Sequence, residues 1–201
     1  MTERLGTRNE LADFLETVPY PGPYVILGVG APCGGRTEAL TEMAYRLGIL
    51  LVGPDEIRKR LIVNAINPYG RSREIWDEVH DLVRRTVVDK HDPVIIDGTH
   101  VVARREGFFE RRNTIPTRSD LVKQYRSYGA RAVMAVVCHV SLEEALKRNQ
   151  QREAGPLPES MLESMIGQLN EVPVSVDEGF DIVASRKSPE DPIVIEQVAG
   201  V

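Results

Sequence analysis

The chain has 201 residues, of which 42% are hydrophobic and 27% are charged, and its formal net charge is −5. This length and composition indicate one ordinary soluble domain and argue against a second large one. No apolar run approaches the roughly 18 residues of a membrane span, and the first residues lead into no apolar signal segment, so we expect a cytoplasmic protein with no membrane partner.

Short apolar runs alternate with helical patterns along most of the chain. Residues before Tyr20 have the pattern of a short leading helix, which the proline-rich segment 19–23 ends. Five strands are predicted after it, over residues 24–29, 48–52, 93–96, 131–139 and 180–184. The runs are continuous rather than alternating, which indicates strands buried on both faces. The sequence therefore predicts an α/β fold with a mostly parallel, five-stranded sheet between layers of helices.

Helices are expected between these strands. They are predicted over residues 35–47, 54–64, 71–89, 118–128, 141–152 and 158–170. Ser141 and the acids after it have the pattern of a helix start. A last run, 193–198, is expected to form an edge strand.

A glycine-rich turn joins the first predicted strand to its helix with the spacing of a phosphate-binding loop. Its residues are Gly30, Ala31, Pro32, Cys33, Gly34, Gly35, Arg36 and Thr37. In G-x-x-x-x-G-K-[ST] the backbone N–H groups surround the phosphates and the hydroxyl ligates magnesium. This pattern predicts bound ATP, or another nucleoside triphosphate, with Mg²⁺ held by Thr37.

Arg36 stands where the pattern has lysine. Lysine is a compact ammonium, whereas a guanidinium is planar and bulkier. Arg36 either binds the β and γ oxygens in a bidentate manner, as a catalytic residue, or moves the phosphates out of line and slows the chemistry. The sequence leaves both open.

Polar residues follow the next two strands, at the sheet edge where ligands of parallel sheets gather. Asp55 is placed to accept the proton of an attacking hydroxyl, and Arg58 to hold an anionic acceptor. Asp97 is placed to organise a magnesium-bound water or to orient an arginine, and Thr99 and His100 are candidates for contact with the acceptor. Asp55 could instead only favour the start of its helix, and His100 could be structural rather than a base.

Two arginines four residues apart follow the fourth strand, on one face of a predicted helix. Arg148 and Arg152 precede a Gly-Pro turn that offers a hinge. Arginines on a mobile segment can offset charge on a transferring phosphoryl group, although a solvated basic face is the plain alternative. We interpret the helix as part of a catalytic lid.

Charge and cysteine give weaker signals. Eight basic and three acidic side chains lie between Arg104 and Arg131, so this segment could meet a nucleic acid backbone or be solvated helix surface. Cys138 lies in an apolar strand and is expected to be a buried thiol, and Cys33 is a reactive loop thiol or a tolerated small residue. No disulfide or metal site follows from two cysteines.

Together these segments resemble the polynucleotide kinase-like branch of P-loop kinases, known from the phage enzyme that phosphorylates 5′-hydroxyl ends. The resemblance covers residues 23–185 and rests on the order of the motifs: the loop, Asp55 to Arg58, Asp97 to His100 followed by Arg104 and Arg105, and then Leu146 to Asn149 with Arg152 and Pro158. It implies a three-layer P-loop NTPase fold over residues 23–201, with a helical lid at about 141–172, after an N-terminal helix and linker over residues 1–22.

The resemblance also implies roles for single residues. Thr37 would hold magnesium, Asp55 would be the general base, and Arg58 would bind the acceptor phosphate. Asp97 would support the acceptor side. Arg148 and Arg152 would belong to the lid.

The function expected from these features is γ-phosphoryl transfer from ATP to a nucleic acid hydroxyl, at a 5′ end or on a hydroxymethylated base. A small-molecule or nucleoside acceptor stays open, because a tight nucleic acid binder usually has more basic surface. A nucleotide-binding protein impaired by Arg36 is a second alternative. An α/β domain with an incidental glycine turn is a third.

Overall fold

The computed structural model describes residues 8–18, 20–61, 72–103, 116–152 and 155–200. Its centre is a six-stranded sheet with the strand order β2-β3-β1-β4-β5-β6. The strands are β1 (Tyr24–Val29), β2 (Leu50–Val52), β3 (Val94–Ile96), β4 (Ala132–Cys138), β5 (Ile182–Arg186) and β6 (Val194–Val198). Strands β1 to β5 are parallel, and β6 pairs antiparallel with β5. The α/β class is confirmed. The sheet has one strand more than the five of the predicted parallel core, because the expected edge strand joins it.

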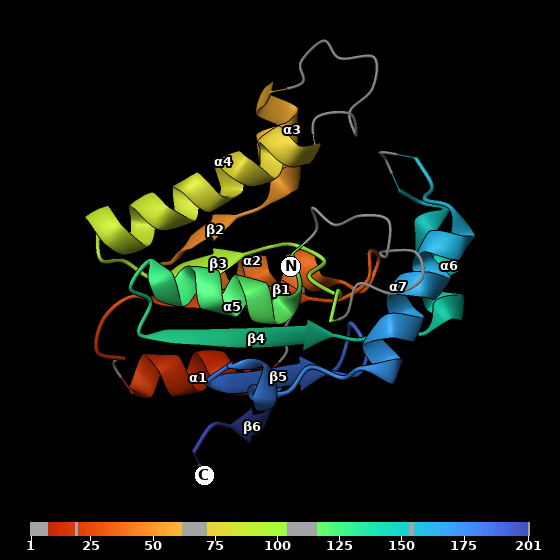
Figure 1. Cartoon of the computed structure of the whole chain (residues 1–201). Helices are drawn as coiled ribbons and strands as arrows, with labels where there is room; N and C mark the ends of the chain where they lie inside the picture. Colours follow the sequence, from red (N-terminus) through yellow and green to blue (C-terminus); the bar gives the residue numbers. More distant parts are fainter. Residues whose placement is uncertain (1–7, 19, 62–71, 104–115, 153–154, 201) are drawn as a thin grey trace, which may run out of the picture.

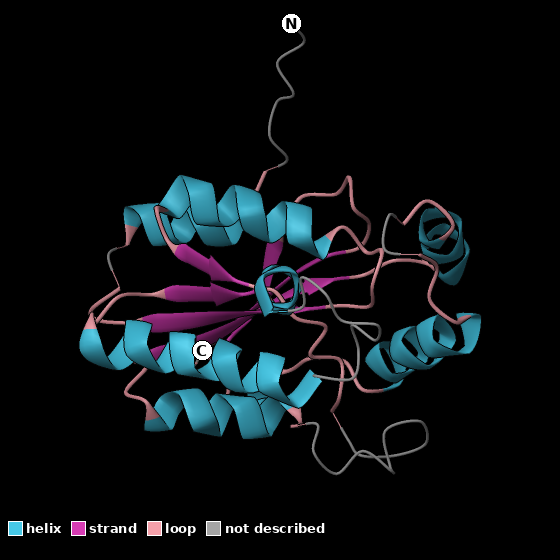
Figure 2. Ribbon diagram, turned by 90° about the horizontal axis from the view of Figure 1, so that it is seen from above, coloured by secondary structure: helices cyan, strands magenta, loops and turns pink. Residues whose placement is uncertain are grey.

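Helices cover both faces of this sheet (Figure 2). They are α1 (Glu10–Thr17), α2 (Arg36–Leu47), α3 (Pro54–Leu61), α4 (Ser72–Arg84), α5 (Arg118–Ser127), α6 (Leu142–Asn149) and α7 (Glu159–Glu171), with a π-helical turn η1 (Arg85–Asp89) and a 3₁₀ turn η3 (Val176–Glu178). The side chains of Asn9, Thr117 and Ser141 cap α1, α5 and α6 by accepting backbone N–H groups. The predicted helices are confirmed where the structure describes them, except that the helix predicted over 141–152 ends at Asn149, so Arg152 lies beyond α6 and does not share a helical face with Arg148. Residues 62–64 of the helix predicted over 54–64 lie outside the described residues.

Every residue of β1 is buried, which explains its continuous apolar run. Val25, Leu27 and Val29 pack in one core cluster with residues of α4 and α5. Ile26 packs in a second cluster, with residues of α1 and α2. Because successive strand residues point to opposite faces, these two clusters are the two helical layers that the sequence predicts.

Helix α1 belongs to this core. Leu11 and Leu15 lie in the same buried cluster as Ile26 of β1 and Met43 of α2. The domain border expected after residue 22 stays a prediction. Within the described residues, no helix combines the length and the apolar character that crossing a bilayer requires.

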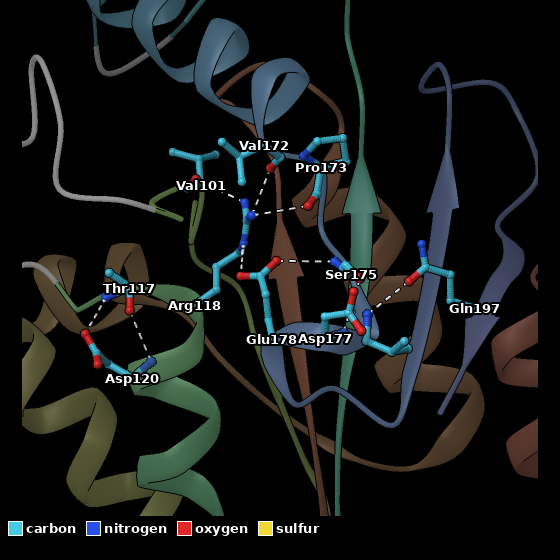
Figure 3. A network of polar contacts seen from close by, with 11 residues as sticks. Val101, Thr117, Arg118, Asp120, Val172, Pro173, Ser175, Asp177, Glu178 and Gln197 are labelled. Atoms are coloured by element: carbon cyan, nitrogen blue, oxygen red, sulfur yellow. Dashed lines mark hydrogen bonds and ion pairs between the residues drawn. The ribbon is translucent and has the colours of Figure 1, made fainter. Parts of the chain in front are cut away.

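Helices α6 and α7 lie beyond the end to which β4 points (Figure 1). A third apolar cluster holds them there, in which Ala31 of the glycine-rich turn packs with Val140, Ala145 and Met165. The end of α7 is fixed by Arg118, which is fully buried and donates to the carbonyl of Val172 at 2.9 Å and to Glu178 at 2.8 Å (Figure 3). The α6–α7 pair is therefore seated at the carboxyl ends of the strands.

Candidate functional site

The glycine-rich turn connects β1 to α2 and lies against the ends of β4 and β5. A Cβ atom on Gly30 would lie 2.5 Å from the carbonyl oxygen of Cys138, which no real contact allows. Gly35 has φ 72°, and a Cβ atom there would meet the Nη2 of Arg186 at 2.7 Å. Both positions thus require glycine, for close approach and for a left-handed backbone. The result is a loop that presents the amino end of the twelve-residue helix α2, where backbone N–H groups attract anions.

Arg36 is held inside the protein. Its Nε donates to Oδ1 of Asp97 at 2.6 Å, and its Nη1 donates to the carbonyl of Gly30 at 2.7 Å. Its stem passes Gly28, where a Cβ atom would lie 2.9 Å from the Cδ of Arg36. Only 12% of either charged side chain is exposed. A guanidinium can make both contacts because its donors point in different directions, which a single ammonium cannot reproduce.

Asp97 also accepts from the loop threonine. The Oγ1 of Thr37 donates to Oδ2 of Asp97 at 2.6 Å, and the Asp97 N–H donates to the carbonyl of Val52 at 2.8 Å. A hydroxyl and a carboxylate are the hard oxygen ligands that Mg²⁺ prefers, so the pair fits the expected metal. Asp97 therefore lies on the nucleotide side of the site, and its predicted contact with the acceptor stays a prediction.

Asp55 and Arg58 form an ion pair with each other on α3. The carboxylate of Asp55 is 78% exposed, so it is accessible to a substrate hydroxyl. Helix α3 starts at the same sheet edge as the loop, since a Cβ atom on Gly53 would lie 3.6 Å from the Cβ of Asp97. The structure thus brings this pair to the edge that carries Asp97, and its roles as base and acceptor contact stay predictions.

The glycine-rich turn and the predicted lid line one pocket of about 590 Å³. Arg148, Gln151 and Arg152 contribute the lid side. Arg148 donates to Glu144 at 2.6 Å and to Glu190 at 2.9 Å, and the hydrogen bond from Arg148 lowers the pKa of the Glu144 carboxyl. Arg148 and Arg152 therefore line the same pocket as the loop, and their place in a catalytic lid stays a prediction.

Thr99 and His100 lie beneath the loop. The Thr99 carbonyl accepts from the Gly30 N–H at 2.9 Å. His100 is buried, its Nδ1 is 2.7 Å from the Gly28 carbonyl, and its ring packs edge-on against Trp76. Burial lowers the pKa of His100 to about 4, against the hydrogen bond to Gly28, which raises it. These contacts give His100 a place in the packing, and the acceptor contact predicted for it and for Thr99 stays a prediction.

Two of the basic side chains between Arg104 and Arg131 are paired with acids in the described residues. Arg118 is buried against Glu178, and Arg126 pairs with Asp181 at 2.5 Å. These two cations are therefore neutralised by the protein itself, and Arg118 is not a surface residue. The arginines within residues 104–115 lie outside the described residues.

The two cysteines are free. Cys33 is half-buried and lines the pocket, with a left-handed φ of 69°. Cys138 is buried, as its apolar strand predicts, and burial raises the pKa of its thiol.

Sequence reasoning missed Gln151 in the pocket and Arg186 behind the loop. Arg186 is the last residue of β5 and donates to the carbonyl of Gly35 at 2.5 Å. The sequence does carry a signal for Arg186, because a cation at the carboxyl end of an apolar parallel strand lies at the same sheet edge as the loop. For Gln151, one turn from Arg148, the sequence carries no special signal.

Comparison with known proteins agrees with this geometry. A sequence family described as an AAA domain matches residues 25–172. No curated protein matches the chain. Three solved structures are similar to it, and each likeness shows the fold alone.

The first belongs to the Pnkp1/Rnl/Hen1 RNA repair complex, with a TM-score of 0.58 and 23% identity over 83% of this chain and 49% of that one. The chain thus spans about half the length of that protein. The second is from the PezAT chromosomal toxin-antitoxin system of Streptococcus pneumoniae, with a TM-score of 0.54 and 15% identity over 89% and 74%. The third is a putative kinase from Chloroflexus aurantiacus, with a TM-score of 0.50 and 13% identity over 66% of each chain.

Proposed function

The chain belongs to the AAA domain family, and from this premise we propose that it is a P-loop kinase that transfers the γ-phosphoryl group of ATP to a hydroxyl of a nucleic acid. One observation carries the proposal: the phosphate loop shares its pocket with Arg148 and Arg152. A loop alone would support nucleotide binding. Added arginines at the same space support transfer, because they can offset the charge that develops on the moving phosphoryl group.

The nucleotide side uses the loop and two oxygen ligands. The backbone N–H groups between Gly34 and Thr37, together with the helix dipole of α2, would hold the phosphates. Thr37 and Asp97, joined at 2.6 Å, would hold Mg²⁺. Mg²⁺ held by these two oxygens would offset negative charge on the phosphates.

The acceptor side uses the exposed pair on α3. The Asp55 carboxylate would take the proton of the attacking hydroxyl, as a general base. Arg58 would leave its ion pair with Asp55 and bind a phosphate of the acceptor. The new contact would be charge-assisted, as the ion pair is. Positioning by Asp55 and Arg58 at the edge that carries Asp97 would put the hydroxyl in line with the loop.

Arg36 does not close the pocket in this arrangement. Its guanidinium is held by Asp97 and Gly30, and a pocket of about 590 Å³ is open beside it. This supports an active enzyme over an impaired one. The ion pair with Arg36 then orders the Asp97 side chain. The loop can bind the phosphates of the nucleotide without a direct contact from Arg36.

A nucleic acid acceptor is supported by the family resemblance and by the fold shared with a chain of the RNA repair complex. A small-molecule or nucleoside acceptor is the second candidate. It is favoured by Arg118 and Arg126, which are paired with acids rather than presented as a basic surface.

A transfer assay with γ-labelled ATP separates these functions. The acceptors are 5′-hydroxyl DNA, 5′-hydroxyl RNA, hydroxymethyl-base DNA and nucleosides, each with the wild-type chain and with Asp55→Asn. We expect label in one polynucleotide class only, and none with the variant. Label confined to nucleosides would replace the proposed acceptor. ATP binding without any transfer would favour the impaired protein, and no shift of thermal stability with ATP or GTP would remove the nucleotide function altogether.

A further inference from the structure

Arg186 is a buried cation directly behind the phosphate loop. Only 4% of the residue is exposed, although it ends strand β5. Its Nη2 donates to the carbonyl of Gly35 at 2.5 Å and lies 3.5 Å from that of Gly34, and its Nη1 donates to the carbonyl of Pro189 at 2.8 Å. The guanidinium thus binds the loop through backbone oxygens, and burial raises the pKa of the Cys138 thiol beside it, against the Arg186 charge, which lowers it.

The charge of Arg186 lacks a counter-ion within the described part of the chain. No carboxylate pairs with it there, and its buried Nε has no hydrogen-bond partner. Arg118 is equally buried but pairs with Glu178 at 2.8 Å. An unpaired buried charge is unfavourable, so proteins keep one where another group compensates it. The nearest place for such a group is the anion-binding loop itself.

The contacts of Arg186 also fix the direction of the loop N–H groups. In a trans peptide the C=O and the following N–H point to opposite sides. With the carbonyls of Gly34 and Gly35 turned toward Arg186, the N–H groups of Gly35 and Arg36 point to the other side of the loop. Arg186 is not among the pocket-lining residues, whereas Gly34 to Thr37 are. Both N–H groups therefore face away from Arg186, toward the pocket side.

Arg186 can supply the positive charge that the lysine of the usual loop supplies and that Arg36 does not. In the usual loop a lysine supplies a positive charge to the phosphates, but here the guanidinium of Arg36 is claimed by Asp97 at 2.6 Å. We propose that Arg186 is a positioning residue of the nucleotide site, which orients the loop from behind and whose buried charge is balanced by the phosphates of the bound nucleotide. This inference rests on the proposed nucleotide-binding function.

The test is titration of the full chain with AMP, ADP and ATP at several salt concentrations, for the wild type, Arg186→Gln and Arg186→Lys. With the glutamine variant we expect the Kd for ATP to rise by about tenfold or more, with a smaller rise for ADP and the smallest for AMP. Its affinity for ATP should also depend less on salt. Lysine keeps the charge, so Arg186→Lys should retain the salt dependence and bind ATP within about threefold of the wild type.

Arg126→Gln is the matched control, because Arg126 binds Asp181, the residue before the other end of β5. It should leave all three affinities unchanged. An equal loss for AMP and ATP with Arg186→Gln, or equal losses with glutamine and lysine, would overturn the role of the charge. If the glutamine variant does not fold, the lysine variant decides: a retained salt dependence supports the inference, and a lost one overturns it. Failure of the wild type to bind ATP would instead be failure of the proposed function.

Discussion

The Nε of Arg36 lies 2.6 Å from Oδ1 of Asp97, and this ion pair ties the phosphate loop to the end of β3. The two residues are 61 positions apart in the chain. Arg36, which stands where the loop pattern has lysine, therefore makes a structural contact within the site. It also couples the stability of the fold to the loop.

Removal of this contact should destabilise the fold. Arg36→Ala leaves the half-buried Asp97 with Thr37 as its side-chain partner, so we expect a loss of about 2 to 3 kcal/mol in the free energy of unfolding. Arg36→Lys keeps one charged contact and should lose about 1 kcal/mol or less. Urea unfolding of both variants, of Asp97→Asn and of Arg36→Ala/Asp97→Asn checks this. Additive losses in the double variant would show that the two side chains are not energetically coupled.

Asp55→Asn should abolish transfer and leave nucleotide binding intact. The amide cannot accept a proton in the chemical step, so we expect kcat to fall by about a hundredfold or more. The Kd for ATP should stay within about twofold, because Asp55 lies on the acceptor side. Glu56→Gln is the matched control, since Glu56 is a similarly exposed neighbour in an ion pair with Lys59. Loss of ATP binding with Asp55→Asn alone would contradict the assigned role.

The sequence predicted the order of strands and helices because its apolar runs are short, continuous and separated by clear breaks. Strand β1 has the predicted bounds, Tyr24–Val29. The sixth strand is weaker in pattern because only its alternate residues are half-buried, so it was expected only as an edge strand. Strand order is a property of the crossovers and was not predicted.

The candidate site was predictable in its residues but less so in its contacts. The loop, Thr37 and Arg148 were found because spacing along one strand or helix determines their place. The ion pair of Arg36 with Asp97 joins the start of helix α2 to the residue after β3, and sequence spacing does not tell which arginine Asp97 meets. His100 follows Asp97 closely, yet its Nδ1 lies 2.7 Å from the carbonyl of Gly28 in β1, and its backbone has a left-handed φ of 40°, neither of which sequence spacing indicates.

Arg152→Gln should lower kcat more than it changes nucleotide affinity. Arg152 and the loop line the same pocket, and loss of one preorganised cation costs about a hundredfold in rate. Lys147→Gln is the control, because Lys147 is a nearby cation on α6 that is exposed and paired with Glu144 at 3.9 Å. Steady-state transfer rates and ATP titrations measure both effects. A similar rate for the two variants would show that the lid arginine has no part in transfer.

Acid should destabilise the protein through His100. Its pKa is about 4 in the fold against about 6.5 in an unfolded chain, so the unfolded state binds the extra proton between these values. Stability from this group is complete above pH 6.5 and falls as the pH falls toward 4, by up to about 3 kcal/mol. Burial also lowers the pKa values of His80 and His139, which add to the same trend.

His100→Asn should flatten this part of the pH profile, since asparagine accepts no proton there and tolerates a positive φ. Thermal unfolding between pH 7 and 4 measures the difference from the wild type. His91→Asn is the control, because His91 is exposed and also has a positive φ, of 57°. A profile of His100→Asn parallel to that of the wild type would contradict the assignment.

The buried guanidinium of Arg118 restricts how the α6–α7 pair can move. It binds the carbonyl of Val172 at the end of α7, while α6 begins directly after β4 at Ser141. The end of α7 is thus attached to α5, and the start of α6 follows directly from β4, whereas the part of the turn between the helices that the structure describes has no such attachment. Closure over a nucleotide would then be a rotation about the line joining these two attached ends, which sweeps Arg152 through a wider arc than Arg148.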